Sequence, residues 1–286
     1  MNRNIIVLAG SGYLGDAIKK ISNNYTFEKI IEFSRTKKIN TKNDIEHYQV
    51  DFDKELKANN FNDKTSIIYM APPRQDVEGD VRLLNFSKSL GYNKIKKIVY
   101  ISTSGVYGDH QGGIVDESAK CIPITDRAKR RLIAEQIIRN YCEKTKNEFV
   151  ILRVPGIYGP KRLPIERIIA GEPIMEENLA KPTNLIHVED LARISWEVMD
   201  SSVKNEIINV SDGNPTTSTR YYIEICKILN LPVPKTITLN EAKKVFSKKR
   251  MSFFMESRVL NVKKLNHLFP DVIKYKDLKE GIQSSI

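Results

Sequence analysis

The sequence has few cysteines and no long apolar run. Its three cysteines, Cys121, Cys142 and Cys226, lie far apart in a chain of 286 residues, so they offer neither a disulfide framework nor the paired spacing of a metal site. We therefore expect no metal and a reducing, cytoplasmic location. No segment is apolar over enough residues to span a membrane. The short apolar run Ile5–Ala9 leads into a glycine turn, which indicates a strand and not a signal peptide.

Positive charge is in excess, because 46 Lys and Arg residues outnumber 35 Asp and Glu residues and give a formal net charge of +11. The lysines are spread over the whole chain, which is typical of a solvated surface. The alternative interpretation is an attraction for anionic ligands, such as a phosphorylated cofactor or a nucleotide-linked substrate. Nucleic-acid binding would rest on net charge alone, and no RNA-binding, zinc-finger or helix-turn-helix motif is present. We therefore expect no nucleic-acid partner.

Strand-like and helix-like segments alternate along most of the chain. This order is typical of an α/β protein in which helices cover both faces of a parallel sheet. After Gly159 the pattern changes, because four prolines break the chain into short pieces. The predicted strands are Ile5–Ala9, Lys29–Phe33, His47–Val50, Ser66–Met70, Lys97–Ser102, Phe149–Arg153 and Ile207–Val210, and the predicted helices include Val81–Leu90, Asp126–Lys144 and Glu189–Met199.

A glycine-rich turn follows the first predicted strand and opens a helix. One glycine permits a tight turn, a second lets a pyrophosphate approach the backbone, and a third lets helix and strand pack closely. The free N–H groups and the dipole at the helix start then hold the anion. We therefore predict a Rossmann-type doubly wound parallel sheet that binds NAD(P). The predicted phosphate site consists of Gly10, Ser11, Gly12, Tyr13, Leu14 and Gly15.

The end of the second strand indicates which dinucleotide binds. A carboxylate there favours the ribose diol of NAD, whereas an arginine favours the 2′-phosphate of NADP. Arg35 follows the strand and Ser34 adds a hydroxyl, so we expect a preference for NADP(H). Glu32 keeps NAD(H) open if the strand ends earlier, and on the other interpretation Arg35 is a plain surface residue. Asp51 and Phe52, after the third strand, are expected to border the adenine.

The change in pattern after Gly159 suggests two parts. We predict an NAD(P)-binding Rossmann domain over residues 1–160, to which residues 183–212 return. Residues 161–182 and 213–286 are predicted to form a small C-terminal substrate lobe. That lobe holds no motif that identifies a substrate.

Further motifs follow the glycine turn in a fixed order. They are Tyr-Ile-Ser-Thr-Ser-Gly-Val-Tyr-Gly at 100–108, Leu-Arg-Val-Pro-Gly-Ile-Tyr-Gly-Pro at 152–160, Ile-His-Val-Glu-Asp-Leu-Ala at 186–192 and Asn-Val-Ser-Asp-Gly at 209–213. With these motifs the chain resembles the extended short-chain dehydrogenase/reductases, the NAD(P)-dependent epimerase/dehydratase superfamily. The resemblance implies that the Thr103 hydroxyl contacts the substrate. It also implies cofactor contacts from Pro155, Gly156 and Ile157 beside the nicotinamide, and from Ala71 and Pro72 after the fourth strand.

The chain departs from this superfamily at the catalytic pair. The family places Tyr-x-x-x-Lys on the long helix, and here the register puts Arg127 at the tyrosine position and Arg131 at the lysine position. Arginine stays protonated up to a pH of about 12, so Arg127 cannot shuttle a proton. It can stabilise an oxyanion or hold a carboxylate or phosphate, while Arg131 can donate to the cofactor ribose. The alternative is that both are solvated helix residues. Tyr107 is a further candidate acid, unless it packs at the strand end.

Two functions remain open on these grounds. The first is an atypical NADP(H)-dependent reductase or epimerase/dehydratase that acts on an anionic small molecule, such as a nucleotide-sugar. The second is a catalytically inactive cofactor-binding sensor or scaffold, which the missing tyrosine and lysine favour. The resemblance also implies a homodimer through the helix Asp126–Lys144. Its apolar stripe, formed by Leu132, Ile133, Ile137 and Ile138, permits such a contact but could equally face the sheet.

Overall fold

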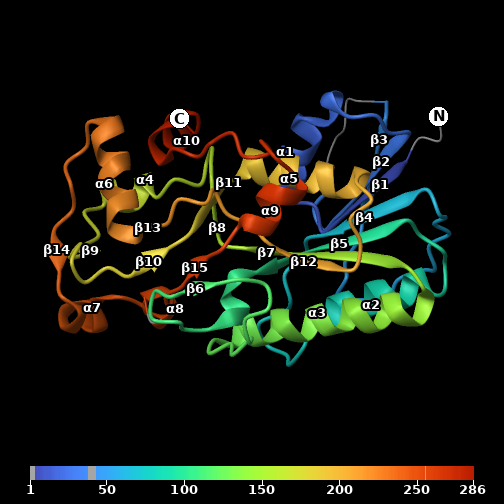
Figure 1. Ribbon diagram of the computed structural model, residues 1–286, viewed down its shortest axis with the longest axis horizontal. Coiled ribbons are helices and arrows are strands. Elements are labelled where there is room, and N and C mark those ends of the chain that lie inside the picture. Colours follow the sequence, from blue (N-terminus) through green and yellow to red (C-terminus); the bar gives the residue numbers. More distant parts are fainter. Residues whose placement is uncertain (1–3, 38–42, 255) are drawn as a thin grey trace. The chain divides into compact units, whose positions relative to one another are not determined.

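The computed structural model describes residues 4–37, 43–254 and 256–286 (Figure 1). The chain divides into two compact units. Residues 1–106, 126–153 and 191–208 form the first unit, and residues 107–125, 154–190 and 209–286 form the second. The second unit takes in more of the chain than the expected lobe, because residues 107–125 and 154–160 pair with later segments. Ile114 pairs with Val259, for example, and Gly156 pairs with Leu185.

A seven-stranded parallel sheet forms the centre of the first unit, so the predicted α/β fold is confirmed. Its strand order is β12-β7-β5-β4-β1-β2-β3. In the first strand of the chain, Ile5 pairs with Lys29 on one side and with Thr65 on the other. Except at the two edges of the sheet, where they are only partly buried, the strands are buried runs without alternation, as expected where helices cover both faces. They are β1 (Ile5–Ala9), β2 (Lys29–Ser34), β3 (Ile45–Gln49), β4 (Thr65–Tyr69), β5 (Lys97–Thr103), β7 (Glu148–Val154) and β12 (Glu206–Asn209).

Helices cover both faces of this sheet. Figure 1 shows α2 (Val81–Leu90) and α3 (Asp126–Thr145) on one face, with α1 (Tyr13–Lys20) and α5 (Val188–Asp200) on the other. Local signals fix the ends of α2, since the side chain of Asp80 accepts a hydrogen bond from Leu83 N and Gly91 follows the last turn with a positive φ. The predicted helices at these positions are confirmed to within two residues at each end.

The apolar stripe expected on α3 divides between core and surface. Ile138 is buried with Ala134 in the main core cluster, whereas Leu132 and Ile137 are half-buried and Ile133 is 38% exposed. The buried face of the helix instead includes a charged residue, Glu135. Its carboxylate accepts hydrogen bonds from Arg153 Nη2 at 2.8 Å and from Ser102 Oγ at 2.6 Å. This buried ion pair ties α3 to β7 and β5.

The second unit consists of short elements around two small apolar clusters. One cluster includes Tyr158, Ile225 and Ile282, and the other includes Met175 and Phe246. Its strands are β6 (Ile114–Val115), β8 (Gly156–Tyr158), β9 (Ile174–Met175), β10 (Pro182–Thr183), β11 (Leu185–His187), β13 (Thr216–Thr217), β14 (Thr236–Ile237) and β15 (Val259–Leu260). Its helices are α4 (Ile165–Ile169), α6 (Ser218–Leu229), α7 (Leu239–Val245), α8 (Lys248–Phe254), α9 (Lys263–Leu268) and α10 (Leu278–Gln283). Of the helices in the described ranges, none has the length and hydropathy to cross a membrane.

A buried carboxylate lies in the turn after β12. Asp212 is 7% exposed, and its Oδ1 accepts a hydrogen bond from Asn214 N at 2.9 Å. Burial raises the pKa of this carboxyl to about 7, and the Asp190 carboxylate adds to the increase. The folded state therefore binds a proton that the unfolded chain releases at a lower pH. Stability falls as the pH rises through this window, from the usual aspartate range to about 7.

Replacing Asp212 with Asn tests this linkage. Because an amide does not ionise, the thermal midpoint of Asp212→Asn is expected to fall less between about pH 5 and about pH 8 than that of the wild type. At the higher pH, the free energy of unfolding of Asp212→Asn should exceed that of the wild type by on the order of 1–3 kcal/mol, because of the size of the pKa shift. The exposed Asp271, changed to Asn, is a matched control that keeps the wild-type pH dependence. Parallel pH profiles for Asp212→Asn and the wild type would contradict the linkage.

Candidate functional site

A cavity of about 370 Å³ opens in the first unit at the carboxyl ends of β1, β2 and β4. It brings together parts of the chain that the sequence placed in one site, namely the glycine turn, the end of the second strand and the residues after the fourth. Leu14 and Gly15 lie buried behind it in α1, and Asp51 accepts a hydrogen bond from Asp53 N beside it. The lining residues are Gly10, Ser11, Gly12, Tyr13, Asp16, Ser34, Arg35, Thr36, Val50, Phe52, Ala71, Pro72 and Arg82.

The three glycines of the turn each meet a different physical demand. Gly10 has a φ of +80°, and a Cβ there would lie 2.6 Å from the backbone N of Ala71. A Cβ at Gly15 would lie 2.1 Å from Ser11 Oγ, so Ser11 would have to move if helix α1 kept its packing against the turn. A Cβ at Gly12 would meet nothing within 4 Å and would instead occupy open space at the cavity. The turn therefore leaves an open space beside its backbone, called the glycine cradle below, which a side chain at Gly12 would fill.

The polar residues at the end of β2 lie in two different environments. Glu32 is fully buried, and its Oε1 accepts hydrogen bonds from Ser11 Oγ at 2.5 Å and Lys19 Nζ at 2.6 Å. The strand continues to Ser34, whose hydroxyl donates to Thr36 O at 2.7 Å and lies 2.9 Å from His47 Nε2. The side chain that follows, Arg35, is exposed and lines the cavity. The cavity therefore has a cation, and no carboxylate of β2, at this end.

A second arginine forms part of the cavity wall. Arg82 Nε and Nη2 each donate to the carboxylate of Asp53 at 2.8 Å, while Nη1 donates to Pro72 O at 2.8 Å. The hydrogen bond from Arg82 holds the pKa of Asp53 below its usual range. Phe52, which the sequence places beside Asp51 after the third strand, also lines the cavity. No local motif indicates Arg82, because its place in the lining depends on how α2 packs.

The candidate catalytic residues of the first unit lie at the start of α3 and the end of β5. Arg131 Nη1 donates to Tyr100 Oη and Ile101 O, both at 3.0 Å, and to Ala71 O at 3.4 Å. Its guanidinium thus contacts the carboxyl ends of β4 and β5. Thr103 is half-buried, and its Oγ1 accepts a hydrogen bond from Gly105 N at 3.2 Å. Arg127 is half-buried in the first turn of α3.

The remaining candidates belong to the second unit. Tyr107 is fully buried, and its hydroxyl donates to Asn209 Oδ1 at 2.7 Å. This contact gives Tyr107 a packing role between two segments of that unit. Gly156 and Ile157 lie in β8, where they pair in register with Leu185 and Ile186, and Pro155 precedes them. Within the residues that the structure describes, no group of three or more His, Cys, Asp or Glu side chains could hold a metal ion.

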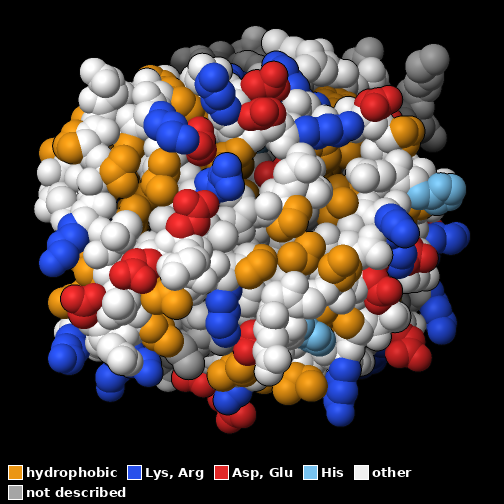
Figure 2. Space-filling view, turned by 60° about the vertical axis from the view of Figure 1, so that its left-hand side comes forward, with side chains coloured by type: hydrophobic (Ala, Val, Ile, Leu, Met, Phe, Trp, Pro, Cys, Tyr) orange, Lys and Arg blue, Asp and Glu red, His pale blue; other side chains and the backbone are white. Residues whose placement is uncertain are grey.

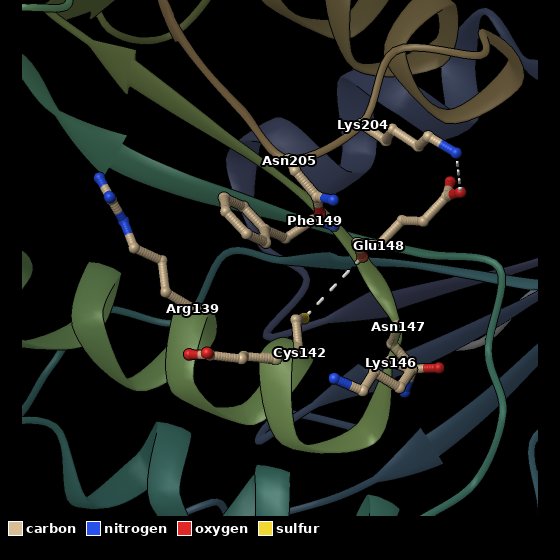
Figure 3. A pocket seen from close by; sticks show the side chains of 9 residues that line it. Arg139, Cys142, Lys146, Asn147, Glu148, Phe149, Lys204 and Asn205 are labelled. Carbon is tan, nitrogen blue, oxygen red and sulfur yellow. Dashed lines mark hydrogen bonds and ion pairs between the residues drawn. The ribbon is translucent and has the colours of Figure 1, made fainter.

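A separate hollow of about 500 Å³ lies at the amino end of β7, next to the end of α3 (Figure 3). Glu148 pairs with Lys204 at 3.3 Å, and Cys142 Sγ lies 3.9 Å from Glu148 O. Burial raises the pKa of the Cys142 thiol to about 12, so it stays protonated and unreactive at neutral pH. The hollow contains no glycine turn. Its lining is Arg139, Cys142, Glu143, Lys146, Asn147, Glu148, Phe149, Lys204 and Asn205.

The excess positive charge is not gathered into one patch on the face that Figure 2 shows. Lys and Arg side chains alternate there with Asp and Glu side chains and with apolar ones. A distribution of this kind is typical of a solvated surface, since binding along a nucleic-acid backbone favours a continuous basic stripe.

The chain is similar to known proteins in sequence and in fold. The NAD dependent epimerase/dehydratase family matches residues 5–211. A putative UDP-glucose 4-epimerase of Methanocaldococcus jannaschii is 28% identical over 240 residues, which cover 74% of this chain and 78% of that protein. A conserved protein of unknown function from Silicibacter pomeroyi has a similar structure, with a TM-score of 0.81, 21% identity and coverage of 98% and 97% of the two chains. The UDP-glucuronic acid 4-epimerase of Bacillus cereus, solved with NAD, has a TM-score of 0.77 and 16% identity. The match covers 99% of this chain and 97% of that protein.

Alanine substitutions at Gly12 and Gly15 are expected to separate binding from folding. Gly12→Ala leaves the thermal midpoint near that of the wild type, because its methyl group enters open space, but it weakens dinucleotide binding at least about tenfold by blocking the backbone. Gly15→Ala forces Ser11 to move, which costs on the order of 1–3 kcal/mol of stability. Thermal melts and isothermal titration measure both effects. Equal loss of stability in the two variants would contradict the assignment of separate roles.

Proposed function

Because the chain belongs to the NAD dependent epimerase/dehydratase family, we propose that it binds NADP(H) in the cavity at the glycine turn and acts on a nucleotide-linked small molecule such as a nucleotide-sugar. The observation that carries the cofactor assignment is the pairing of an open glycine cradle at Gly12 with the exposed Arg35 in one cavity. Structural neighbours contain NAD with UDP-glucuronic acid or UDP-glucose. These neighbours support a nucleotide-sugar as the substrate class.

The preference for the 2′-phosphorylated cofactor rests on charge at the end of β2. Glu32, which would favour a ribose diol, already accepts hydrogen bonds from Ser11 and Lys19 inside the protein. Arg35 can donate two parallel hydrogen bonds to a phosphate, and the planar guanidinium suits that geometry. Arg82 adds a second cation to the wall, although Asp53 balances its charge. An anion is therefore favoured at this end of the cavity.

In this proposal some residues bind the cofactor and others act on the substrate. Backbone N–H groups at the start of α1 hold the pyrophosphate, and Arg131 holds Ala71 and Ile101 at the adjoining sheet edge. The bound cofactor supplies the hydride acceptor or donor. Thr103 Oγ1 donates to the substrate oxygen that changes its bond order. Arg127 stabilises negative charge on that oxygen or on an anionic group of the substrate, since its guanidinium is a cationic hydrogen-bond donor.

A second candidate function is a cofactor-binding sensor or scaffold without turnover. One observation favours it: the long helix carries arginine at both positions where the family has its tyrosine and lysine. The hydroxyl of Tyr107, the other candidate acid, is also engaged with Asn209. Proton transfer would then lack a side chain with a suitable pKa.

Removing the cation at Arg35 tests the cofactor preference. Arg35→Ala is expected to raise the Kd for NADP⁺ about 10- to 100-fold, because a charge-assisted bidentate contact is lost. The Kd for NAD⁺ should change less than about twofold. Arg139→Ala, which removes an arginine from the hollow at the amino end of β7, serves as the control with unchanged affinities. Equal weakening of both dinucleotides by Arg35→Ala would contradict the preference.

Turnover assays distinguish the two functions. Purified protein with NADP(H) or NAD(H) and a panel of UDP- and dTDP-linked sugars is expected to show epimerase, dehydratase or reductase activity. Thr103→Val should lower kcat about 10²-fold, because the hydroxyl acts on the reacting oxygen. Activity that survives Thr103→Val unchanged would remove this residue from the mechanism. Cofactor binding without turnover over the whole panel would instead favour the sensor.

A further inference from the structure

A carboxylate lies in the middle of a strand that is otherwise buried and mostly apolar. Glu32 is one of five consecutive buried residues of β2, and its side chain is 0% exposed. Removing a carboxylate from water is costly unless partners replace the solvent. Replacing a whole buried ion pair by apolar residues of similar size is often neutral for stability. The partners of Glu32 therefore point to what the carboxylate contributes.

Two hydrogen-bond partners of Glu32 come from the glycine turn and from the helix that it opens. Ser11, between the first two glycines, donates its hydroxyl to Glu32 Oε1 at 2.5 Å, and Lys19 on α1 donates to the same oxygen at 2.6 Å. Ser11 is 6% exposed, and the side chain of Lys19 is 13% exposed. Lys19 Nζ also lies 3.1 Å from Asp16, which lines the cavity.

Backbone hydrogen bonds also connect the glycine turn to β2. Gly10 N and Ser11 N both donate to Phe33 O, at 3.0 and 2.8 Å. Consecutive residues of β2 thus hold the turn, Glu32 through its side chain and Phe33 through its carbonyl. Gly15 leaves room for this arrangement, because a Cβ there would lie 2.1 Å from Ser11 Oγ.

We propose that Glu32 is a positioning residue for cofactor binding: its buried carboxylate fixes Ser11 and α1, and thereby orients the N–H groups of the turn toward the pyrophosphate. The inference rests on the cofactor site proposed above. It gives Glu32 a role different from the ribose contact that an acidic residue of the second strand commonly makes. A group that acts through the turn affects every ligand with a pyrophosphate, whereas a ribose contact affects NAD⁺ alone.

Three ligands separate positioning from other roles. NADP⁺ and NAD⁺ share the pyrophosphate, while adenosine 2′-monophosphate has the 2′-phosphate without it. In Glu32→Gln, the Kd values for NADP⁺ and NAD⁺ should rise by the same factor, about tenfold, and the Kd for adenosine 2′-monophosphate should stay within about twofold of the wild type. Glu46→Gln, which breaks the 2.8 Å ion pair with Lys29 at the neighbouring strand, is the matched control and should change none of them.

A second variant covers the case in which Glu32→Gln does not fold. Ser11→Ala removes only the hydroxyl, keeps the Glu32–Lys19 pair, and should weaken both dinucleotides about threefold, without effect on adenosine 2′-monophosphate, by loosening the turn. All titrations are run well below the thermal midpoint of each variant.

The outcomes are distinct. A lower thermal midpoint with unchanged affinities would assign Glu32 a purely structural role and overturn the proposal, as would weakening of NAD⁺ alone. A wild-type protein that binds neither dinucleotide would overturn the proposed cofactor site as well. Wild-type binding with unaltered affinities in both folded variants would overturn the positioning role and leave the cofactor site standing.

Discussion

The glycine turn depends on its attachment to the second strand. One carbonyl, Phe33 O, accepts hydrogen bonds from Gly10 N and Ser11 N, and the neighbouring Glu32 carboxylate accepts the Ser11 hydroxyl and the Lys19 ammonium. The glycines matter because this attachment is close: Gly10 passes Ala71 and Gly15 passes Ser11 at distances that exclude a Cβ. Gly12, which faces open space, is then the position at which a ligand can approach the backbone.

Much of the fold could be predicted because short-range patterns specify it. The strand Ile5–Ala9 and the helix Val81–Leu90 have the expected bounds, since β-branched apolar runs and a capping Asp80 act locally. The glycine turn was equally readable, because its spacing reflects backbone geometry. The extent of the second unit could not be predicted from the sequence. Strands of two or three residues, such as β6 and β8, have no periodicity, and only their pairing with later segments places them.

Side-chain direction was the part of the site that sequence could not specify. Glu32 and Arg35 are three residues apart, yet one is bonded inside the fold and the other lines the cavity. The core face of α3 includes Glu135 because Arg153, 18 positions later, compensates its charge. Arg131 likewise finds Tyr100, Ile101 and Ala71 on two other strands. Each of these partners is distant in sequence, so no local pattern indicates which way the side chain turns.

The central claim is that the glycine turn and Arg35 together form an NADP(H) site in a member of the epimerase/dehydratase family. The cavity combines an open glycine turn, the exposed cation of Arg35 and a β2 carboxylate that is already hydrogen-bonded. Isothermal titration of the wild-type protein with NADP⁺ and NAD⁺ tests it most directly. Binding of one NADP⁺ per chain, at least about tenfold tighter than NAD⁺, is the predicted result. Equal or tighter binding of NAD⁺, or no binding of either, would contradict the claim.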